Sequence, residues 1–497
     1  MPMEDMLEML KSCCRRELER LYPAGVPPAA MWRYRHELEL VERAGTAEEY
    51  LLFREISKAA ERTFSKIYVP NSVQGTMLVY LLGDHDLNPL SAHYYCTACG
   101  YYTEPKGVVV GLDLPPADCP HCGKPLRRDG FSLRRQWSDS AVEMGAFSYW
   151  FSNGFYPTGC RVIEQHYRKR GRCAVPSACW RDSADRYESH GMVVLPRGKT
   201  MDTMPEALKI RDEFGVLCID VTDLDKVPVP LELRRTELLD RMEALQRESG
   251  ILFSELPVIL PTRTLLQDML VTDIPDKEER ALLRRQKPTT IGAIMDCLTA
   301  CCNLYERPGG DSTSYDSLYR KLRWDERFAR SFAEYPVYSR EALYALLRRE
   351  GWCRERAFEL TESIRRGRWC FDPEQRAQWL PQKLLWQCAR IVYLSGRAPG
   401  CWWGLQYLRM AQYLHLVPQT FYRVMWGVWR RLTERGSSTT MEGTFPPGHG
   451  QFGAVYCHLP RQERFERGPL PQVRGPAAEV TFYNRTENAY GKNETAR

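Results

Sequence analysis

The first sixty residues carry apolar side chains at helical spacing. Apolar positions recur within Met6–Leu10, Leu38–Val41 and Tyr50–Leu52, and polar residues fill the positions between them. This period is typical of amphipathic helices. Pro27 and Pro28 interrupt the pattern and mark a break between two helices. The sequence therefore predicts an N-terminal helical segment over residues 1–60.

Residues 61–230 show a different pattern, with short apolar runs rich in β-branched residues. Ile67–Leu82 and Val108–Val110 have the composition of strands, and Met192–Leu195 and Val216–Val221 fit buried strands. Apolar runs this short also occur in buried helices, so periodicity alone leaves that alternative open. We expect a mixed α+β domain over residues 61–230.

From Leu231 onward the pattern returns to helical stripes with charged opposite faces. The stripes run through Leu231–Arg247, Lys277–Arg285, Ile291–Cys302, Arg340–Glu350, Arg354–Arg366 and Leu384–Leu394. This pattern predicts a mostly helical domain over residues 231–434. Residues 435–497 are rich in Gly, Pro, Ser and Thr and poor in large apolar groups, which is typical of a disordered tail.

Composition narrows the class of protein. A chain of 497 residues with 43% hydrophobic and 27% charged residues is long enough for about three folded units. The net charge is +6, so an anion-binding site must arise from local clustering of charge. No apolar stretch approaches the roughly 20 residues of a membrane span. We expect a soluble, cytoplasmic protein that has no membrane partner and keeps its cysteines reduced.

Two cysteine pairs form the strongest chemical signal. Cys96 and Cys99 are followed after 19 residues by Cys119 and Cys122. Each Cys-x2-Cys pair places two sulfurs on one tight turn, and two such turns complete a tetrahedral thiolate site. The spacing predicts a zinc ribbon at residues 94–126 with a structural zinc ion. His121 lies inside the second turn, where we expect it to face solvent and not the metal.

The motifs around this ribbon resemble the palm region of the bacterial PolC-type DNA polymerase III alpha chain. The matching motifs are Asn71-Ser72-Val73, Leu87-Asn88-Pro89-Leu90, His93-Tyr94-Tyr95-Cys96, Leu112-Asp113-Leu114-Pro115 and Asp129-Gly130. Weaker similarities follow in the same order, at Phe151-Ser152, Gly191–Pro196, Leu217–Asp220, Lys287–Thr290, Leu343–Arg368 and Cys388–Trp426. The resemblance covers roughly Arg33 to Arg430. It implies an α+β nucleotidyltransferase-like palm remnant with an inserted zinc ribbon, followed by a mostly helical fingers-like domain.

The resemblance also implies where catalytic carboxylates belong. In the family two Asp residues lie on one strand shortly before the Phe-Ser step, and a third lies on the Leu-x-x-Asp strand. Anchored at Phe151-Ser152, the two strand positions are Ala146 and Ser148, while the third is retained as Asp220. Two magnesium ions need several carboxylates, so we expect a polymerase fold without polymerase activity and consider magnesium binding doubtful. Two alternatives stay open: Asp139 or Glu143 supplies a relocated ligand in an active polymerase, or Asp220 only caps a turn.

Other family elements are altered as well. The family's glycine-rich phosphate loop corresponds to Pro70–Thr76, where the basic residue and both glycines at their own positions are replaced. Backbone amides approach a triphosphate closely only where side chains leave room, so nucleotide binding is also in doubt. The basic residue of a fingers turn corresponds to Arg397.

Basic clusters keep DNA binding open as a function. The candidate contacts to nucleic acid are Arg168, Lys169, Arg170, Arg172, Arg365, Arg366, Arg368 and Arg397. Such clusters are also common on solvated helix faces that bind nothing. We therefore expect a degenerate PolC-like protein that binds DNA or replisome proteins. The alternatives are an active DNA-directed DNA polymerase and a zinc-stabilised protein-interaction scaffold.

Overall fold

The computed structural model describes residues 3–425, except 71, 84, 134–146, 182–185, 223–230, 254–255, 257, 259, 273, 276, 307–311, 315–336, 366–383, 385–387 and 389–390. The chain divides into two compact units, Met1–Asp240 with Thr290–Gly404 and Arg241–Thr289 with Leu405–Arg497. The domain boundaries expected at residues 60, 230 and 434 stay predictions. The expected disordered tail lies outside the described residues.

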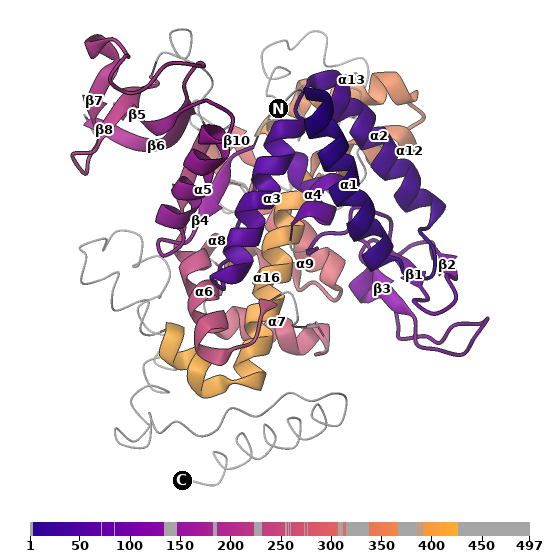
Figure 1. Ribbon diagram of the computed structural model, residues 1–497. Coiled ribbons are helices and arrows are strands. Elements are labelled where there is room, and N and C mark those ends of the chain that lie inside the picture. The colour runs from indigo at the N-terminus through magenta and orange to yellow at the C-terminus, as the bar shows by residue number, and fades with distance from the viewer. Residues whose placement is uncertain are drawn as a thin grey trace, which may run out of the picture. The chain divides into compact units, whose positions relative to one another are not determined.

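The N-terminal part of the first unit is helical, as predicted. Its elements are α1 (Met3–Leu21), α2 (Pro28–Ala44), α3 (Ala47–Arg62), the 3-10 turn η1 (Ser72–Gly75) and α4 (Met77–Leu82). The helices α1, α2 and α3 each pack against α4 (Figure 1). Leu10, Val41, Tyr50 and Ile56 are fully buried there and supply part of one large apolar core. Gly45 ends α2 in the left-handed conformation, at φ 66°, which glycine adopts without strain.

The strand prediction for Ile67–Leu82 is wrong over most of its length. Only Tyr68 makes a β-bridge, to Trp150, and Met77–Leu82 forms the short helix α4. The Thr76 side chain accepts a hydrogen bond from the Val79 amide at 3.2 Å and caps this helix. All six residues of α4 are buried, so the apolar run carries no polar face from which a helical period could be read.

The ribbon region contains a small antiparallel sheet in the order β2-β1-β3. Its elements are β1 (His93–Tyr95), β2 (Tyr102–Thr103), the 3-10 turn η2 (Gly111–Asp113) and β3 (Arg127–Asp129). The expected strand at Val108–Val110 is wrong, because this segment is a bend that leads into η2. Gly111 lies so close to β3 that an added Cβ would stand 2.1 Å from the Asp129 carbonyl oxygen.

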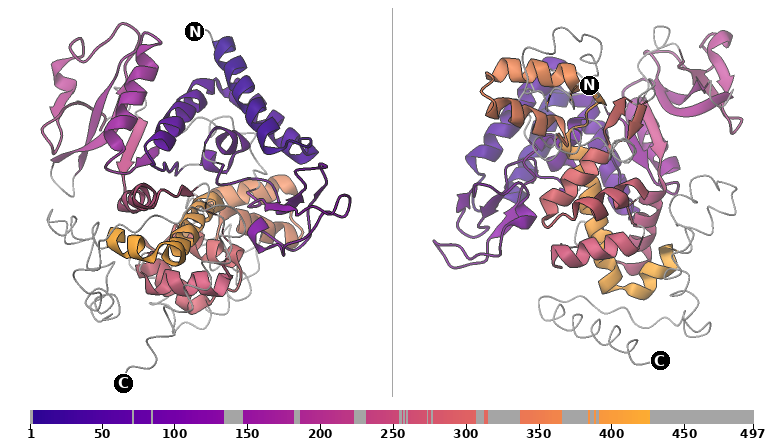
Figure 2. Two further views of the ribbon diagram at one scale, coloured as in Figure 1. Left: turned by 60° about the horizontal axis from the view of Figure 1, so that its bottom comes forward. Right: turned by 180° about the vertical axis from the view of Figure 1, so that it is seen from behind.

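A six-stranded mixed sheet follows in the order β4-β9-β6-β5-β8-β7. Its strands are β4 (Tyr149–Phe151), β5 (Ala174–Arg181), β6 (Arg186–Val194), β7 (Lys209–Arg211), β8 (Leu217–Asp220) and β9 (Leu231–Arg235). β6 and β8 confirm the predicted strands at Met192–Leu195 and Val216–Val221. The helix α5 (Tyr156–Arg168) lies beside the sheet (Figure 2) and also packs on α3.

The two faces of this sheet bury different clusters. On the helix-covered face, Tyr149, Phe151 and Leu233 join the large core with α3 and α5. On the opposite face, Val175, Val193 and Ile219 form a smaller cluster. Because side chains alternate along a strand, these two clusters fix the face of every neighbouring residue.

The remaining elements are mostly helical. They are α6 (Glu237–Ser249), α7 (Thr262–Val271), α8 (Lys277–Gln286), α9 (Ile291–Cys301), β10 (Leu304–Glu306), β11 (Ser312–Ser314), α12 (Arg340–Arg349), α13 (Arg354–Arg365), β12 (Ile391–Tyr393) and α16 (Arg397–Leu416). Two helix predictions need correction: Leu231–Arg247 begins with strand β9, and Leu384–Leu394 contains strand β12. The strands β11, β10 and β12 form a further small sheet.

Candidate metal centre and palm-like site

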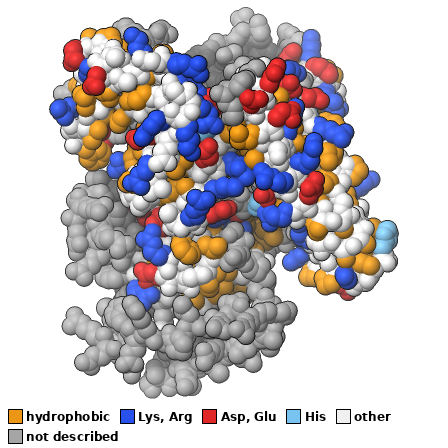
Figure 3. Space-filling view, in the orientation of Figure 1, with side chains coloured by type: hydrophobic (Ala, Val, Ile, Leu, Met, Phe, Trp, Pro, Cys, Tyr) orange, Lys and Arg blue, Asp and Glu red, His pale blue; other side chains and the backbone are white. Residues whose placement is uncertain are grey.

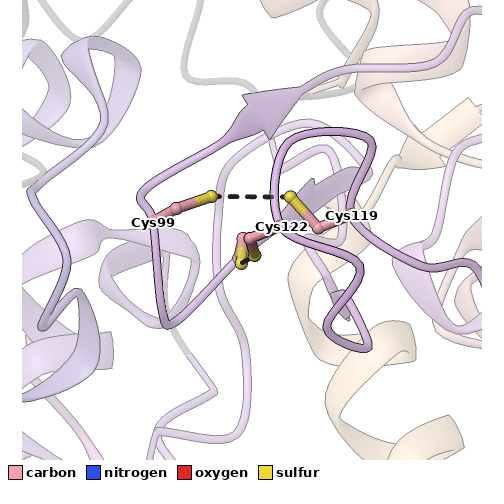
Figure 4. A group of neighbouring side chains, drawn as sticks. Cys99, Cys119 and Cys122 are labelled. Atoms are coloured by element: carbon pink, nitrogen blue, oxygen red, sulfur yellow. Dashed lines mark hydrogen bonds between the residues drawn. The ribbon is translucent and has the colours of Figure 1, made fainter.

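Four cysteine side chains converge at the tip of the ribbon (Figure 4). The sulfur atoms of Cys96, Cys99, Cys119 and Cys122 all lie within 4.8 Å of one another. Cys96 Sγ lies 3.5 Å from Cys122 Sγ, and Cys99 Sγ lies 3.5 Å from Cys119 Sγ. These separations are far longer than the roughly 2.05 Å of a disulfide bond. The structure thus brings together all four predicted metal ligands as free thiols.

Two matching turns position the sulfurs. In the first turn the Cys96 amide donates to the Tyr101 carbonyl and the Gly100 amide donates to the Cys96 carbonyl. In the second, the Cys119 amide donates to the Lys124 carbonyl and the Gly123 amide donates to the Cys119 carbonyl. Gly100 and Gly123 both have positive φ, 77° and 68°, which a left-handed turn requires.

The sulfur geometry fits a tetrahedral metal ion. A metal with bonds of about 2.3 Å to four sulfurs separates those sulfurs by roughly 3.8 Å, close to the observed contacts. Burial opposes ionisation of Cys96, but the backbone amides of Ala98 and Cys99 donate to its sulfur and lower the pKa of that thiol to about 6. A cation would stabilise the remaining thiolates in the same way. The cluster could therefore hold a structural metal, with no ligand position left for catalysis. His121 is exposed and packs its ring against Tyr101, with the ring centroids 4.8 Å apart.

Two polar residues from the family-like motifs connect the ribbon to α1. The Asn88 side chain donates to Tyr22 Oη at 3.1 Å and to Asp129 Oδ2 at 2.8 Å. On the same strand as Asp129, Arg127 donates to the Leu21 carbonyl at 2.8 Å, and its guanidinium lies over the rings of Tyr22 and Tyr95. These contacts therefore hold the ribbon against the end of α1.

Asp113, in the Leu-Asp-Leu-Pro motif, caps α9. Its carboxylate accepts hydrogen bonds from the Ile291 amide at 2.7 Å and the Gly292 amide at 2.8 Å. Both amides belong to the first turn of α9, where no partner within the helix exists for them. The negative charge also stabilises the positive end of the helix dipole. The ribbon loop and α9 are thus joined by one side chain.

We predict that Asp113→Ala lowers the free energy of unfolding by about 1–2 kcal/mol, the usual cost of losing a helix cap. Chemical denaturation followed by circular dichroism measures this change. Glu39→Ala, which removes an exposed carboxylate from α2, serves as the control and should leave the midpoint unchanged. Equal stability of the Asp113 variant and the wild type would contradict the capping role.

The segment that corresponds to the phosphate loop is packed into the protein. Val73, Gln74 and Thr76 are buried, and the carbonyl of Gly75 accepts a hydrogen bond from Arg33 at 3.1 Å. An added Cβ on Gly75 would lie 3.3 Å from the Ala398 side chain. These contacts leave little room for a triphosphate beside this backbone.

The structure separates two of the predicted catalytic positions. Ser148 directly precedes β4. Tyr149 points to the helix-covered face of the large sheet, so Ser148 and Trp150 on either side of it point to the face away from the helices. Asp220 ends β8 between Ile219 and Val221, which both face the smaller cluster, so its side chain points to the helix-covered face. β8 lies four strand spacings from β4, about 19 Å. The third position, Ala146, and the alternative ligands Asp139 and Glu143 all lie outside the described residues.

The Asp220 carboxylate has local hydrogen-bond partners. Oδ1 accepts from the Thr222 amide at 2.9 Å, and Oδ2 accepts from Tyr187 Oη at 3.0 Å. The first bond is the turn-capping arrangement that the sequence left open as an alternative. The backbone that follows β8 is thus held at Thr222 by the carboxylate that the resemblance retains at the third catalytic position.

A carboxylate that the sequence analysis missed lies next to Ser148. β9 pairs in parallel with β4, and Tyr149 is opposite Leu233. This register places Glu232 beside Ser148 on the same face, one strand spacing or about 4.8 Å away. Glu232 accepts a hydrogen bond from Arg234 at 2.6 Å. In the sequence, the alternation of Leu231 and Leu233 could have indicated this strand. We missed it because we predicted one continuous helix over Leu231–Arg247.

Aromatic side chains pack around β4 on the face of the sheet that points away from α3 and α5, the face of Ser148 and Trp150. The ring of Trp150 lies 5.3 Å from that of Tyr68, and Tyr68 in turn lies 4.7 Å from Trp402 and 4.5 Å from Trp403. Arg234 covers Trp150 from outside, at 5.7 Å from the ring centroid. The described surroundings of Ser148 are thus this aromatic cluster together with the carboxylate of Glu232, and the segment 134–146 that precedes Ser148 lies outside the described residues.

The basic residues expected to bind nucleic acid differ in their accessibility. Arg168 and Lys169, at the end of α5, are exposed. Arg170 and Arg172 both form ion pairs with Glu48 of α3. On the face drawn in Figure 3, Lys and Arg side chains gather in the middle of the view with a few acidic side chains among them.

Two other expected contacts are used inside the protein. Arg397 is only 5% exposed, and it donates to Asp296 at 2.8 Å and to the Phe131 carbonyl at 2.6 Å. Although burial opposes its charge, the nearby carboxylate of Asp296, which accepts a hydrogen bond from it, helps to raise the pKa of Arg397 above its usual value. Arg365 pairs with Glu362 at 2.9 Å. The surface role expected for Arg397 is therefore corrected to a buried ion pair, and Arg366 and Arg368 lie outside the described residues.

Comparison with known proteins supports a PolC-like region. The chain is 32% identical over 135 residues to the PolC-type DNA polymerase III of Thermotoga petrophila, a match that covers 26% of this chain and 10% of the relative. The PolC-type enzyme of Oceanobacillus iheyensis is 30% identical over 124 residues, covering 24% of this chain and 9% of the relative. The PolC-type enzyme of Bacillus subtilis (strain 168) is 27% identical over 128 residues, and the match covers 25% of this chain and 9% of the relative.

The chain spans about a tenth of the length of these curated relatives. No protein-family model matches it. None of the helices within the described ranges is both long and apolar enough to cross a membrane. The wider resemblance from Arg33 to Arg430 stays a prediction, and about a quarter of the chain is identified as a region similar to PolC-type DNA polymerase III.

Proposed function

We propose that this chain is a catalytically inactive relative of the PolC polymerase core that binds DNA without copying it. The observation that carries this proposal is the environment of Ser148. A serine occupies a position that requires a carboxylate, and Asp220 lies on the other face of the sheet about 19 Å away. On this proposal residues 61–230 act as a palm remnant and residues 231–434 as a fingers-like domain, in the cytoplasm.

Structural zinc is the metal that best fits the ribbon. Four cysteine sulfurs in a tetrahedral arrangement favour zinc over the hard cations magnesium and calcium, which prefer oxygen ligands. Cys96, Cys99, Cys119 and Cys122 would hold it, and its contribution would be to fold the two turns around one point.

DNA binding is tested with a primer–template duplex. We expect the wild-type chain to bind it, and the affinity should fall steeply between about 50 and 200 mM salt, since neutralised phosphates release counterions. Arg168→Ala with Lys169→Ala should weaken binding and reduce the salt slope by about 2, one for each lost phosphate contact. Arg15→Ala with Arg16→Ala provides the control, because it removes two exposed charges from α1.

Two competing functions predict different results. A zinc-stabilised interaction scaffold for replisome proteins would show no duplex binding even near 50 mM salt. An active polymerase would bind the duplex and extend its primer. Among the described strand residues of β4, β8 and β9, neither Glu232 nor Asp220 has a second acidic neighbour on its own face, which supports the inactive assignment. Asp139 and Glu143, the relocated ligands of the active alternative, lie outside the described residues, so primer extension decides between the two.

A further inference from the structure

Exposed aromatic rings gather at one end of the helix-covered face of the large sheet. Trp180 on β5 is 38% exposed, and its cross-strand partner Tyr187 on β6 lies 5.1 Å away in an edge-to-face arrangement. Phe214, in the turn between β7 and β8, is 62% exposed. Hydrophobic side chains accordingly reach the surface over β5, β7 and β8 in Figure 3. We call Trp180, Tyr187 and Phe214, together with Arg235, the aromatic surface.

An arginine stacks on the same surface. The guanidinium of Arg235, on β9, lies 4.2 Å from the ring centroid of Tyr156 and 5.3 Å from that of Phe214. It therefore presents a planar cationic group next to an exposed ring. Arg235 is itself exposed, and such a pair stacks readily on a further flat ring.

Two acidic residues described near the aromatic surface are held by hydrogen bonds to the sheet. Glu213 accepts a hydrogen bond from the Ser189 amide at 2.7 Å, and Asp220 accepts one from Tyr187 Oη at 3.0 Å. The second bond fixes the Tyr187 ring, so the carboxylate acts here as a positioning group. These two negative charges also disfavour phosphates directly over the rings, which leaves stacking as the main attraction.

We propose that the aromatic surface stacks unpaired bases of single-stranded DNA. Sheets with exposed aromatic side chains commonly hold two or three splayed bases, and a stacked base is tolerated whatever its sequence. Flat rings beside a guanidinium match bases better than they match the aliphatic side chains of a protein interface. The choice of DNA as the ligand rests on the proposed function, whereas the stacking geometry stands independently of it.

The test compares two oligonucleotides of equal length and charge, dT12 and a 12-mer of abasic sites. Binding of dye-labelled strands is followed by fluorescence anisotropy. We expect wild-type chain to bind dT12 at least tenfold more tightly than the abasic strand. Trp180→Ala and Phe214→Ala should each weaken dT12 binding about tenfold and leave abasic binding unchanged, because one stacked base is lost in each. The preference for dT12 should vary little with salt, since both strands carry the same phosphates.

Trp32→Ala is the matched control. Trp32 is also 62% exposed and stacks on His36 at 5.2 Å, but it lies on α2. Its variant should bind dT12 as the wild type does. Equal binding of both strands by the wild type, or unchanged dT12 binding by the Trp180 and Phe214 variants, overturns the proposal. Loss of duplex binding with the dT12 preference intact would refute the proposed duplex function alone, so the two failures are distinguishable.

Discussion

Primer extension by the purified chain is expected to be undetectable, at least about 10⁴-fold below that of a working polymerase core under the same conditions. Nucleotidyl transfer needs carboxylates that hold two metal ions against the primer hydroxyl and the triphosphate. Ser148 supplies no charge, and Asp220 lies on the other face of the sheet. Each lost metal ligand costs several kcal/mol of transition-state stabilisation, and every 1.4 kcal/mol is a tenfold loss in rate.

The assay uses a labelled primer–template, magnesium and all four deoxynucleotides. Glu232→Gln is the informative variant, because Glu232 is the carboxylate beside Ser148. We expect it to behave as the wild type, with no extension. Templated incorporation by the wild type that Glu232→Gln or Asp220→Ala abolishes would overturn the inactive assignment.

The metal cluster was predictable from sequence because each of its turns is local. Two cysteines separated by two residues share one turn, so Cys96 with Cys99 and Cys119 with Cys122 needed only one long-range contact between the pairs. Helices with clear polar faces were also predictable, because their apolar and polar positions alternate within a short stretch of sequence. α8, α9 and α12 begin at the residues where their stripes begin, Lys277, Ile291 and Arg340.

The wrong secondary-structure predictions lie where contacts between residues distant in sequence determine whether a segment is a helix or a strand. Met77–Leu82 has no polar face, and only its burial by three helices makes it helical. Leu231–Leu233 becomes a strand because β4 and β6 offer pairing partners on both sides, which no local pattern reveals. The error hid Glu232 and left Asp220 as the only visible candidate for a third carboxylate.

The sequence also did not show which of the basic residues are buried in the folded protein. Arg168 and Arg397 look alike in sequence, each within a helix that carries aromatic neighbours. In the structure one is exposed at the end of α5, and the other lies at the start of α16 with Asp296 as its ion-pair partner. A phosphate could reach the first, whereas the guanidinium of the second is buried and already paired with Asp296.

Removal of the metal is expected to unfold the ribbon and to destabilise the first unit with it. Structural zinc sites in small peptides contribute roughly 10 kcal/mol or more to folding, because the ion binds the site that folding forms and the unfolded chain offers no such site. The ribbon strand β3 contributes the bond from Arg127 to the Leu21 carbonyl of α1 and the bond from Asn88 to Asp129, and the ribbon loop contributes the Asp113 cap of α9. Unfolding of the two cysteine turns should therefore also destabilise the elements that contact the ribbon, outside residues 94–126.

Cys119→Ser tests this expectation, because Cys119 is buried and its sulfur lies next to Cys99. Elemental analysis should find one zinc per wild-type chain and less than about a tenth of that in the variant, and the thermal midpoint should fall by more than about 10 °C. Cys353→Ser removes an exposed thiol outside the cluster and should keep both the metal and the midpoint. If Cys119→Ser retains a full equivalent of zinc with an unchanged midpoint, the four sulfurs are not a structural site. A midpoint lowered equally by both substitutions would point to a general sensitivity of the fold to thiol loss, and the specific link from ribbon to α1 and α9 would fail.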